Sequence, residues 1–255
     1  MHLVPSPAFS ILSWNILAAS YAKPQFWTHV APQYLKPRYR RALTLQFLDS
    51  HHPSVFCLQE CDEYFNFWKG AFTDLGYQTV YAPRTGTKRD GCCIAYDPSA
   101  LDYQSHWILH YDDISSLAVM DEDRIGFRDN AINEVFEVDQ GIQQRASTWN
   151  PVDVTKEKQF KMTDELKTKI ATCQTYSVGL IVLFHDKRSQ KPVIVATTHL
   201  FWNPDYYQIK LYQSMYLLKA IQIIQQQEGS DTPVFITMDS NSLPYSIVYD
   251  YYCLK

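Results

Sequence analysis

Residues 232–246 read TPVFITMDSNSLPYS, an apolar run that passes directly into polar residues. Val234–Met238 is rich in β-branched and aromatic side chains, a composition typical of a short buried strand. Asp239 and Asn241 follow two positions apart, so extended backbone would place both side chains on the same face. The stretch therefore predicts a carboxylate beside a carboxamide where a buried strand ends.

This pattern has two interpretations. A carboxylate next to an amide at a strand end is one way in which proteins build a site for a cation or a phosphate. Asp, Asn and Ser also form turns readily, so the same residues are typical of a strand that simply stops. Pro244 and Ser246 predict a turn into a new helix. The rest of the chain has to decide between the two interpretations.

The composition favours one globular domain. The chain has 255 residues and is 46% hydrophobic, enough for one sizeable core but too short for two comfortable domains. We therefore expect a single domain over residues 8–255. The formal net charge of -4 argues against a non-specific nucleic-acid coat protein, although a nuclease needs only a local basic groove.

The cysteines and the hydropathy pattern predict an intracellular protein, cytoplasmic or nuclear. None of the spacings between the six cysteines matches a structural zinc site, so we expect reduced and mostly buried thiols. Residues 1–7 contain prolines and lack the apolar segment of a signal peptide. The longest plain apolar run, Val178–Phe184, is far too short to cross a bilayer.

Strand-like and helix-like segments alternate along the chain, which favours the α/β class. The segments with strand patterns are Phe9–Leu17, Ser54–Glu60, Tyr77–Ala82, Gly91–Tyr96, Tyr103–Ile114, Tyr176–His185, Pro192–Leu200 and Val234–Met238. Helical periodicity marks Tyr39–Ser50, Cys61–Leu75 with Gly76 as its cap, and Pro204–Glu228. Residues 115–175 are polar without clean periodicity, which predicts an insertion.

Two basic segments have open roles. The basic residues at the start of the first predicted helix are most simply a solvated face; they are Lys36, Arg38, Arg40 and Arg41. The most basic loop is PRTGTKRDG, residues 83–91, with Arg84, Lys88 and Arg89. It is either a solvated turn or a loop that faces phosphate.

Five polar residues each follow an apolar strand: Asn15, Glu60, His199, Asp239 and Asn241. In a layered α/β protein such strand ends can gather at one edge of the sheets. Separately each residue is a weak signal, but together they favour a site for a metal and a phosphate. Hard oxygen ligands indicate Mg²⁺ and not zinc, for which one histidine is too few.

Five blocks carry a resemblance to a known family. In chain order they are SWNILAASYA (13–22), VFCLQECDEYFNFW (55–68), KRDGCCIAY (88–96), ATTHLFWNPDYYQIKLYQ (196–213) and DSNSLPYS (239–246). These blocks resemble the endonuclease/exonuclease/phosphatase superfamily, within it the branch of deadenylase-type nucleases that includes nocturnin, the Angel proteins and yeast Ngl proteins. The resemblance implies a four-layer α/β sandwich, two packed mixed β-sheets flanked by helices, with the last strands missing from this sequence.

The resemblance also implies roles for individual residues. Glu60 would be the main Mg²⁺ ligand, with Asn15 as a further ligand and Asp239 completing the shell around metal and phosphate. His199 would donate to the phosphoryl oxygens, and Asn241 would orient the attacking water or the phosphate. Further substrate contacts would come from Pro204, Asn241, Arg84, Lys88, Arg89 and, by a weaker match in FRDN, Asn130.

The implied activity is Mg²⁺-dependent hydrolysis of phosphodiesters, with Mn²⁺ as the alternative cation, by a 3′–5′ exoribonuclease acting on poly(A) or other single-stranded RNA. Two alternatives stay open: a hydrolase of a small nucleotide or other phosphoester, and a catalytically inactive binding module. The sequence has no leucine-rich repeats ahead of the domain, so we expect no route to the large deadenylase complex.

The sequence departs from the family pattern in two respects. The family has two further C-terminal blocks, which supply an Asp and an Asp-His pair, and this sequence stops at Lys255 before either. We therefore expect little or no nuclease activity and low stability from these residues alone. Met238 and Ser240 also stand where the family usually has Gly and Phe, so we expect Met238 to crowd the approach of a phosphate.

Overall fold

The computed structural model describes residues 9–113 and 174–253, and within them it forms two four-stranded sheets. The first sheet has the order β1-β2-β4-β3 and contains β1 (Ile11–Asn15), β2 (Val55–Gln59), β3 (Gln78–Pro83) and β4 (Gly91–Tyr96). The second has the order β5-β6-β7-β8 and contains β5 (Leu101–His110), β6 (Val178–Asp186), β7 (Lys191–His199) and β8 (Val234–Asp239). Both sheets are mixed, because β1 runs parallel to β2 and β7 parallel to β8, whereas the other neighbours are antiparallel.

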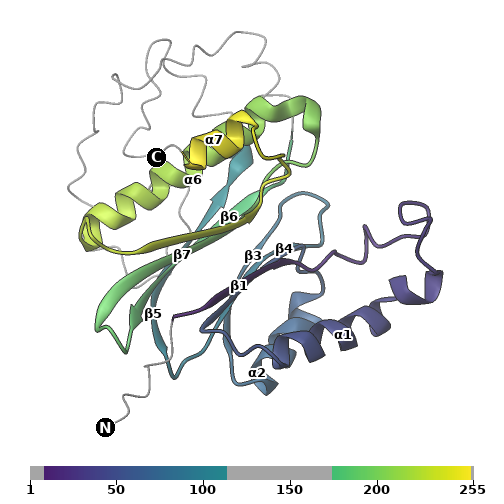
Figure 1. Cartoon of the computed structure of the whole chain (residues 1–255), viewed down its shortest axis with the longest axis horizontal. Helices are drawn as coiled ribbons and strands as arrows, with labels where there is room; N and C mark the ends of the chain where they lie inside the picture. Colours follow the sequence, from purple (N-terminus) through teal and green to yellow (C-terminus); the bar gives the residue numbers. More distant parts are fainter. Residues whose placement is uncertain (1–8, 114–173, 254–255) are drawn as a thin grey trace.

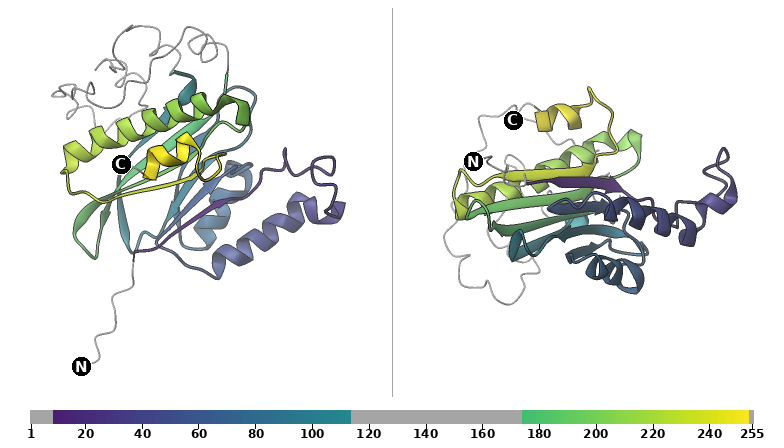
Figure 2. Two further views of the ribbon diagram at one scale, coloured as in Figure 1. Left: turned by 45° about the horizontal axis from the view of Figure 1, so that its top comes forward. Right: turned by 60° about the horizontal axis from the view of Figure 1, so that its bottom comes forward.

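Helices cover the outer face of each sheet (Figures 1 and 2). The helices beside the first sheet are α1 (Pro37–Asp49) and α2 (Lys69–Asp74), and those beside the second are α6 (Tyr207–Glu228) and α7 (Ile247–Cys253). Short turns of other helix types lie at Pro32–Leu35, Tyr64–Trp68, Tyr111–Asp113 and Pro204–Tyr206. No helix in these described segments is long and apolar enough to span a membrane.

Three apolar clusters separate the layers. Along β2, Val55 and Cys57 face the cluster between the two sheets, while Phe56 and Leu58 face the cluster under α1 and α2. A third cluster joins α6 to the second sheet. Side chains of the Leu or Phe type contribute roughly 1.5–3 kcal/mol each when fully buried, so β2, buried on both faces, anchors the fold. The predicted four-layer α/β sandwich is confirmed.

Local structure differs from the predicted elements in one helix. The segment Cys61–Leu75 becomes helical only at Tyr64, and it begins with a π-helical turn. The reason is that Cys61 exchanges two backbone hydrogen bonds with Gly91 in β4, which keeps it out of a helix. Gly76 has φ +84°, so it does cap this helix in the left-handed conformation as predicted. Of the predicted insertion at 115–175, only residues 174 and 175 lie inside the described residues, and Asn130 lies outside them.

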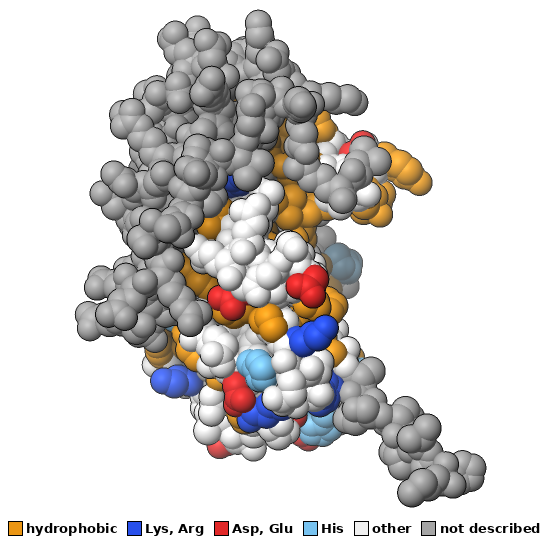
Figure 3. Space-filling view, turned by 90° about the vertical axis from the view of Figure 1, so that its left-hand side faces the viewer, with side chains coloured by type: hydrophobic (Ala, Val, Ile, Leu, Met, Phe, Trp, Pro, Cys, Tyr) orange, Lys and Arg blue, Asp and Glu red, His pale blue; other side chains and the backbone are white. Residues whose placement is uncertain are grey.

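The ends of four strands meet at one edge of the sandwich. β1 and β2 are parallel neighbours, as are β7 and β8, so each pair ends in the same direction. Near this edge the buried Gln59 of β2 donates to Thr197 of β7 at 2.9 Å, which ties the two sheets together. The end at which β6 turns into β7 is viewed in Figure 3, where acidic, basic and histidine side chains lie scattered among apolar ones.

Candidate active site

Asn15 sits between two carboxylates at this edge. Its Nδ2 donates to Glu60 Oε1 and to Asp239 Oδ2, each at 2.8 Å. Its Oδ1 accepts the backbone N–H of Leu17 at 2.9 Å, which fixes the orientation of the amide. The two bonded carboxylate oxygens therefore share one donor, and they lie no farther apart than twice the 2.8 Å length of these bonds. Asn15 presents nitrogen and not oxygen to them.

Glu60 is held from a second side. The residue follows β2 directly, has a left-handed φ of +55° and is 8% exposed. Its Oε2 accepts the backbone N–H of Ala18 at 2.9 Å. Because both carboxylate oxygens have donors from β1 or from the segment that follows it, Glu60 is fixed in position. A non-glycine residue with positive φ is uncommon and occurs often at functional sites.

Asp239 and Asn241 come together through a turn and not along a strand. β8 ends at Asp239, Asn241 has φ +46°, and the Asn241 N–H donates to Asp239 Oδ1 at 3.0 Å. The prediction that extended backbone places both side chains on one face is therefore wrong, since the side chain of Asp239 itself bends the chain. Lys210 of α6, only 3% exposed, donates to the Asn241 carbonyl at 2.7 Å and so supports this turn.

His199 ends β7 beside both carboxylates. Asn241 Nδ2 lies 2.7 Å from His199 Nε2 and donates to the Leu200 carbonyl at 3.0 Å, so Nδ2 is the amide nitrogen and Nε2 accepts from it. The neutral ring then carries its proton on Nδ1, which is buried without a hydrogen-bond partner 3.9 Å from Glu60 Oε1. Burial lowers the pKa of His199, although Asp239 and Glu60 act in the opposite direction.

A divalent cation fits this arrangement. Two carboxylates converge, and a neutral His199 adds no positive charge beside them. Within residues 9–113 and 174–253 no group of three or more His, Cys, Asp or Glu side chains is placed to hold a metal. Mg²⁺ commonly binds through one or two carboxylates plus water and substrate phosphate, so a pair is a sufficient protein contribution. Glu60 and Asp239 are a pair of carboxylates that could hold such a cation.

The basic loop between β3 and β4 lies near the site. The Arg84 guanidinium donates to the carbonyls of Thr175 and Tyr176 and pairs with Asp90, so it fastens the loop to the second sheet. The Arg84 charge lowers the pKa of His199, and the charge of its partner Asp90 raises it. Lys88 Nζ lies 5.8 Å from the Tyr21 ring centroid, and Arg89 is exposed.

Two further sequence expectations concern the rim of the site. Pro204 is exposed and is the first residue of the 3-10 turn that precedes α6. The Asn203 side chain caps this turn by accepting the Asp205 N–H. Met238 packs against the apolar cluster under α6. Its side chain is only partly buried there, so the expectation that Met238 crowds the approach of a phosphate stays a prediction.

Sequence reasoning missed three contributors to this site. Arg40, interpreted as part of a solvated face, donates to two backbone carbonyls next to Asn15. Arg40 could not be recognised, because a sequence does not show which backbone carbonyls lie near a side chain. Lys210 did carry a signal, since a lysine on the apolar stripe of a long helix is buried and needs an acceptor. Tyr21, whose hydroxyl accepts from Arg84 at 3.5 Å, carried none.

Comparison with known proteins places these features in a family. No model of a known protein family matches the chain. Carbon catabolite repressor protein 4 homolog 4 of Arabidopsis thaliana is 32% identical over 249 residues, which cover 95% of the chain and 55% of the relative. The probable CCR4-Not complex 3′-5′-exoribonuclease subunit Ccr4 of Enterocytozoon bieneusi is 33% identical over 98 residues, 38% of the chain and 20% of the relative. The chain thus spans about half the length of the first of these relatives.

A solved structure supports the same conclusion for the fold. ANGEL2, described as a 2′,3′-cyclic phosphatase, superposes with a TM-score of 0.68 at 24% identity, over 96% of this chain and 56% of its own. Its likeness concerns the fold, that is, the two packed sheets and their helices. The sequence relatives of this chain are thus proteins of the carbon catabolite repressor 4 and Angel type, and proteins with the same fold include nocturnin and a member of the endonuclease/exonuclease/phosphatase superfamily, in agreement with the resemblance seen in the sequence.

Proposed function

We propose that this chain carries the phosphodiester-hydrolysing site of a metal-dependent 3′–5′ exoribonuclease, with single-stranded RNA, and poly(A) in particular, as substrate. The observation that carries the proposal is the convergence of Glu60 and Asp239 on Asn15, with His199 beside them. The named exoribonuclease among the relatives supports RNA as the substrate class. The five free thiols among the described residues support a reducing, intracellular compartment.

Glu60 and Asp239 would hold the cation, Mg²⁺ or Mn²⁺, through their carboxylate oxygens. A cation bound there supplies charge neutralisation for the scissile phosphate and lowers the pKa of a water. Asn15 keeps the two carboxylates at a fixed separation, because its Nδ2 bonds both of them. This pre-organisation means that little reordering is needed when the substrate arrives.

His199 and Asn241 would act on the phosphate as a unit. Asn241 holds the imidazole through Nε2, so the proton on Nδ1 is the one available to a phosphoryl oxygen. Burial keeps water from competing with this donor, and a donor in a low-dielectric site stabilises developing negative charge more than one in water. Lys88 and Arg89 would contact the RNA backbone at the rim.

A second candidate concerns the end of the RNA. Because ANGEL2, the structural relative with a TM-score of 0.68, is described as a 2′,3′-cyclic phosphatase, the same site could open a cyclic phosphate instead of removing nucleotides. Both reactions transfer a phosphoryl group to water beside a divalent cation. They differ in product, since only the exonuclease shortens the RNA.

Cation binding is the first test, because it does not depend on turnover. Titration with Mn²⁺, followed by electron paramagnetic resonance, should show one site in residues 1–255. Glu60→Gln or Asp239→Asn should weaken this site at least tenfold, since each removes a charged ligand. Asp74→Asn, an exposed carboxylate on α2, is the matched control and should bind as the unaltered chain does. Equal affinity in all four proteins would rule out the proposed site.

Turnover then separates the candidates. Oligo(A) with a 5′ label is supplied with a 3′-hydroxyl or with a 2′,3′-cyclic phosphate, with Mg²⁺ or with a chelator. A ladder of shortened products that Glu60→Gln abolishes supports the exoribonuclease, and ring opening without shortening supports the second candidate. On sequence grounds we expect slow turnover from this chain, because one general acid or base is worth about 10²–10⁴-fold. Cation binding without either product would support the inactive binding module.

A further inference from the structure

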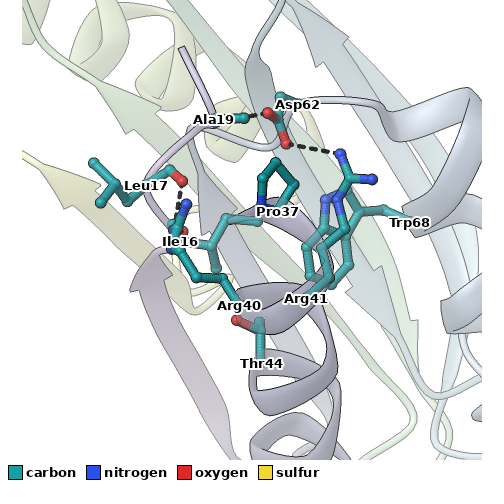
Figure 4. A pocket seen from close by; sticks show the side chains of 9 residues that line it. All are labelled: Ile16, Leu17, Ala19, Pro37, Arg40, Arg41, Thr44, Asp62 and Trp68. Atoms are coloured by element: carbon teal, nitrogen blue, oxygen red, sulfur yellow. Dashed lines mark hydrogen bonds and ion pairs between the residues drawn. The ribbon is translucent and has the colours of Figure 1, made fainter. Parts of the chain in front are cut away.

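Arg40 on α1 is bonded to the segment that carries the site. One guanidinium nitrogen donates to the Ile16 carbonyl at 2.5 Å and to the Leu17 carbonyl at 2.6 Å. These two carbonyls belong to the peptide units on either side of Leu17. Figure 4 shows the Arg40 side chain reaching them across a small pocket, while Arg41 points to Asp62.

Leu17 needs such support because of its backbone conformation. Its φ is +58°, in the left-handed region that a branched residue rarely adopts. A donor that bonds both flanking carbonyls at once holds their relative orientation and therefore holds the dihedral angles of the residue between them. Arg40 is half-buried, so water competes little for these bonds.

The same segment aims its N–H groups at the site. Leu17 N–H donates to Asn15 Oδ1, Ala18 N–H to Glu60 Oε2, and Ala19 N–H to Asp62 Oδ2 at 2.7 Å. The directions of the first two depend on the conformation at Leu17, because the peptide planes rotate with it. A relaxed Leu17 would therefore release both the Asn15 amide and one oxygen of Glu60.

We propose that Arg40 is a positioning residue that locks Leu17 in the left-handed conformation and thereby fixes Asn15 and Glu60 for cation binding. The cation-binding half of this inference rests on the proposed function. The conformational half does not, because it concerns bonds within the protein. Burial lowers the pKa of Arg40, while Asp62 and Glu60 raise it, so the guanidinium has carboxylates nearby that favour its charged form.

The experiment compares Arg40→Met, Arg40→Lys and the control Arg38→Met in the full chain. Arg38 lies on the same helix and is exposed, so its replacement changes the same charge without touching the segment. Hydrogen exchange of individual amides is followed by nuclear magnetic resonance without metal or RNA. The Ala18 amide should exchange at least tenfold faster in Arg40→Met, and the Leu180 and Val195 amides in β6 and β7 should not change.

Rescue and cation binding complete the test. Arg40→Lys and Arg40→Met with millimolar guanidinium should each restore part of the Ala18 protection, which a general loss of stability would not allow. Mn²⁺ affinity should fall at least fivefold in Arg40→Met and stay unchanged in Arg38→Met. Ala18 protection equal to that of Arg38→Met, or an equal acceleration at Leu180 and Val195, would overturn the proposal. If Arg40→Met does not fold, Arg40→Lys decides by the same comparison.

The two hypotheses fail in different ways. If the unaltered chain binds no Mn²⁺, the proposed function is wrong, but the exchange of Ala18 still tests what Arg40 does. If Mn²⁺ binds and Arg40→Met leaves both the affinity and the Ala18 exchange unchanged, only the inference about Arg40 is wrong. The two readouts therefore keep the hypotheses apart.

Discussion

At the residue scale, Gln59, the residue before Glu60 in the chain, connects the two sheets. It is 1% exposed, and its Nε2 donates to Thr197 Oγ1 at 2.9 Å and to Ser13 Oγ at 3.3 Å. We predict that Gln59→Ala lowers the free energy of unfolding by about 1–3 kcal/mol, because Thr197 loses a buried partner and a void remains. Urea unfolding followed by circular dichroism measures this. Gln46→Ala, at an exposed position on α1, should cost less than about 0.5 kcal/mol, and an equal loss in both variants would contradict the prediction.

Single residues also show where sequence reasoning succeeds. Glu60, His199 and Asp239 could be predicted to lie together because each is a polar side chain at the end of an apolar strand, although β8 is only partly buried and not buried as predicted. Arg40 could not, because a charged residue on a helix ordinarily faces water, and Lys210 was missed although its place on the apolar stripe of α6 marks it. Their acceptors are backbone carbonyls of distant segments, and a sequence does not show where a carbonyl points.

At the scale of elements, the loop between β3 and β4 is the candidate RNA contact. We predict that Lys88→Ala with Arg89→Ala weakens binding of fluorescent oligo(A) severalfold and makes it less dependent on salt. Each phosphate contact removed should lower the slope of log affinity against log salt by about 0.7. Fluorescence anisotropy at several salt concentrations measures both. Lys187→Ala, at the β6–β7 turn on the opposite end, is the control, and a slope identical to that of the control would refute an RNA contact by this loop.

The elements themselves were predictable where one periodicity dominates. The helix α6 and the strands β6 and β7 agree with their sequence patterns within a few residues. The late start of this helical segment, at Tyr64, was not predictable. Cys61 forms two backbone hydrogen bonds with Gly91 of β4, and these override its helical propensity. The turn at Asn241 was missed for a related reason: Asp239 accepts the Asn241 N–H, and that local bond replaces extended backbone.

For the whole molecule, the α/β class follows from the alternation of patterns, but the strand order does not. The order β1-β2-β4-β3 places β4 between β2 and β3. This central position agrees with the burial of both faces of β4. The positions of the buried cysteines follow from this arrangement of strands. Cys57 and Cys92 face the cluster between the sheets, and Cys61 and Cys93 face the cluster under α1 and α2. The first sheet therefore carries thiols on both of its faces.

These thiols test whether residues 8–255 unfold as one domain. Burial raises the pKa of Cys57 to about 12 and shifts that of Cys92 in the same direction, so the reactive thiolate is rare at pH 8. In a chain with Cys173→Ser and the exposed Cys253→Ser, we predict that a thiol reagent labels none of the remaining four cysteines until urea unfolds the protein. Mass spectrometry of the labelled peptides should then give one midpoint for all four, since β2 and β4 belong to both clusters and neither can open alone. Labelling of Cys61 and Cys93 at a lower urea concentration than Cys57 and Cys92 would instead mean that the helical layer unfolds separately from the packed sheets.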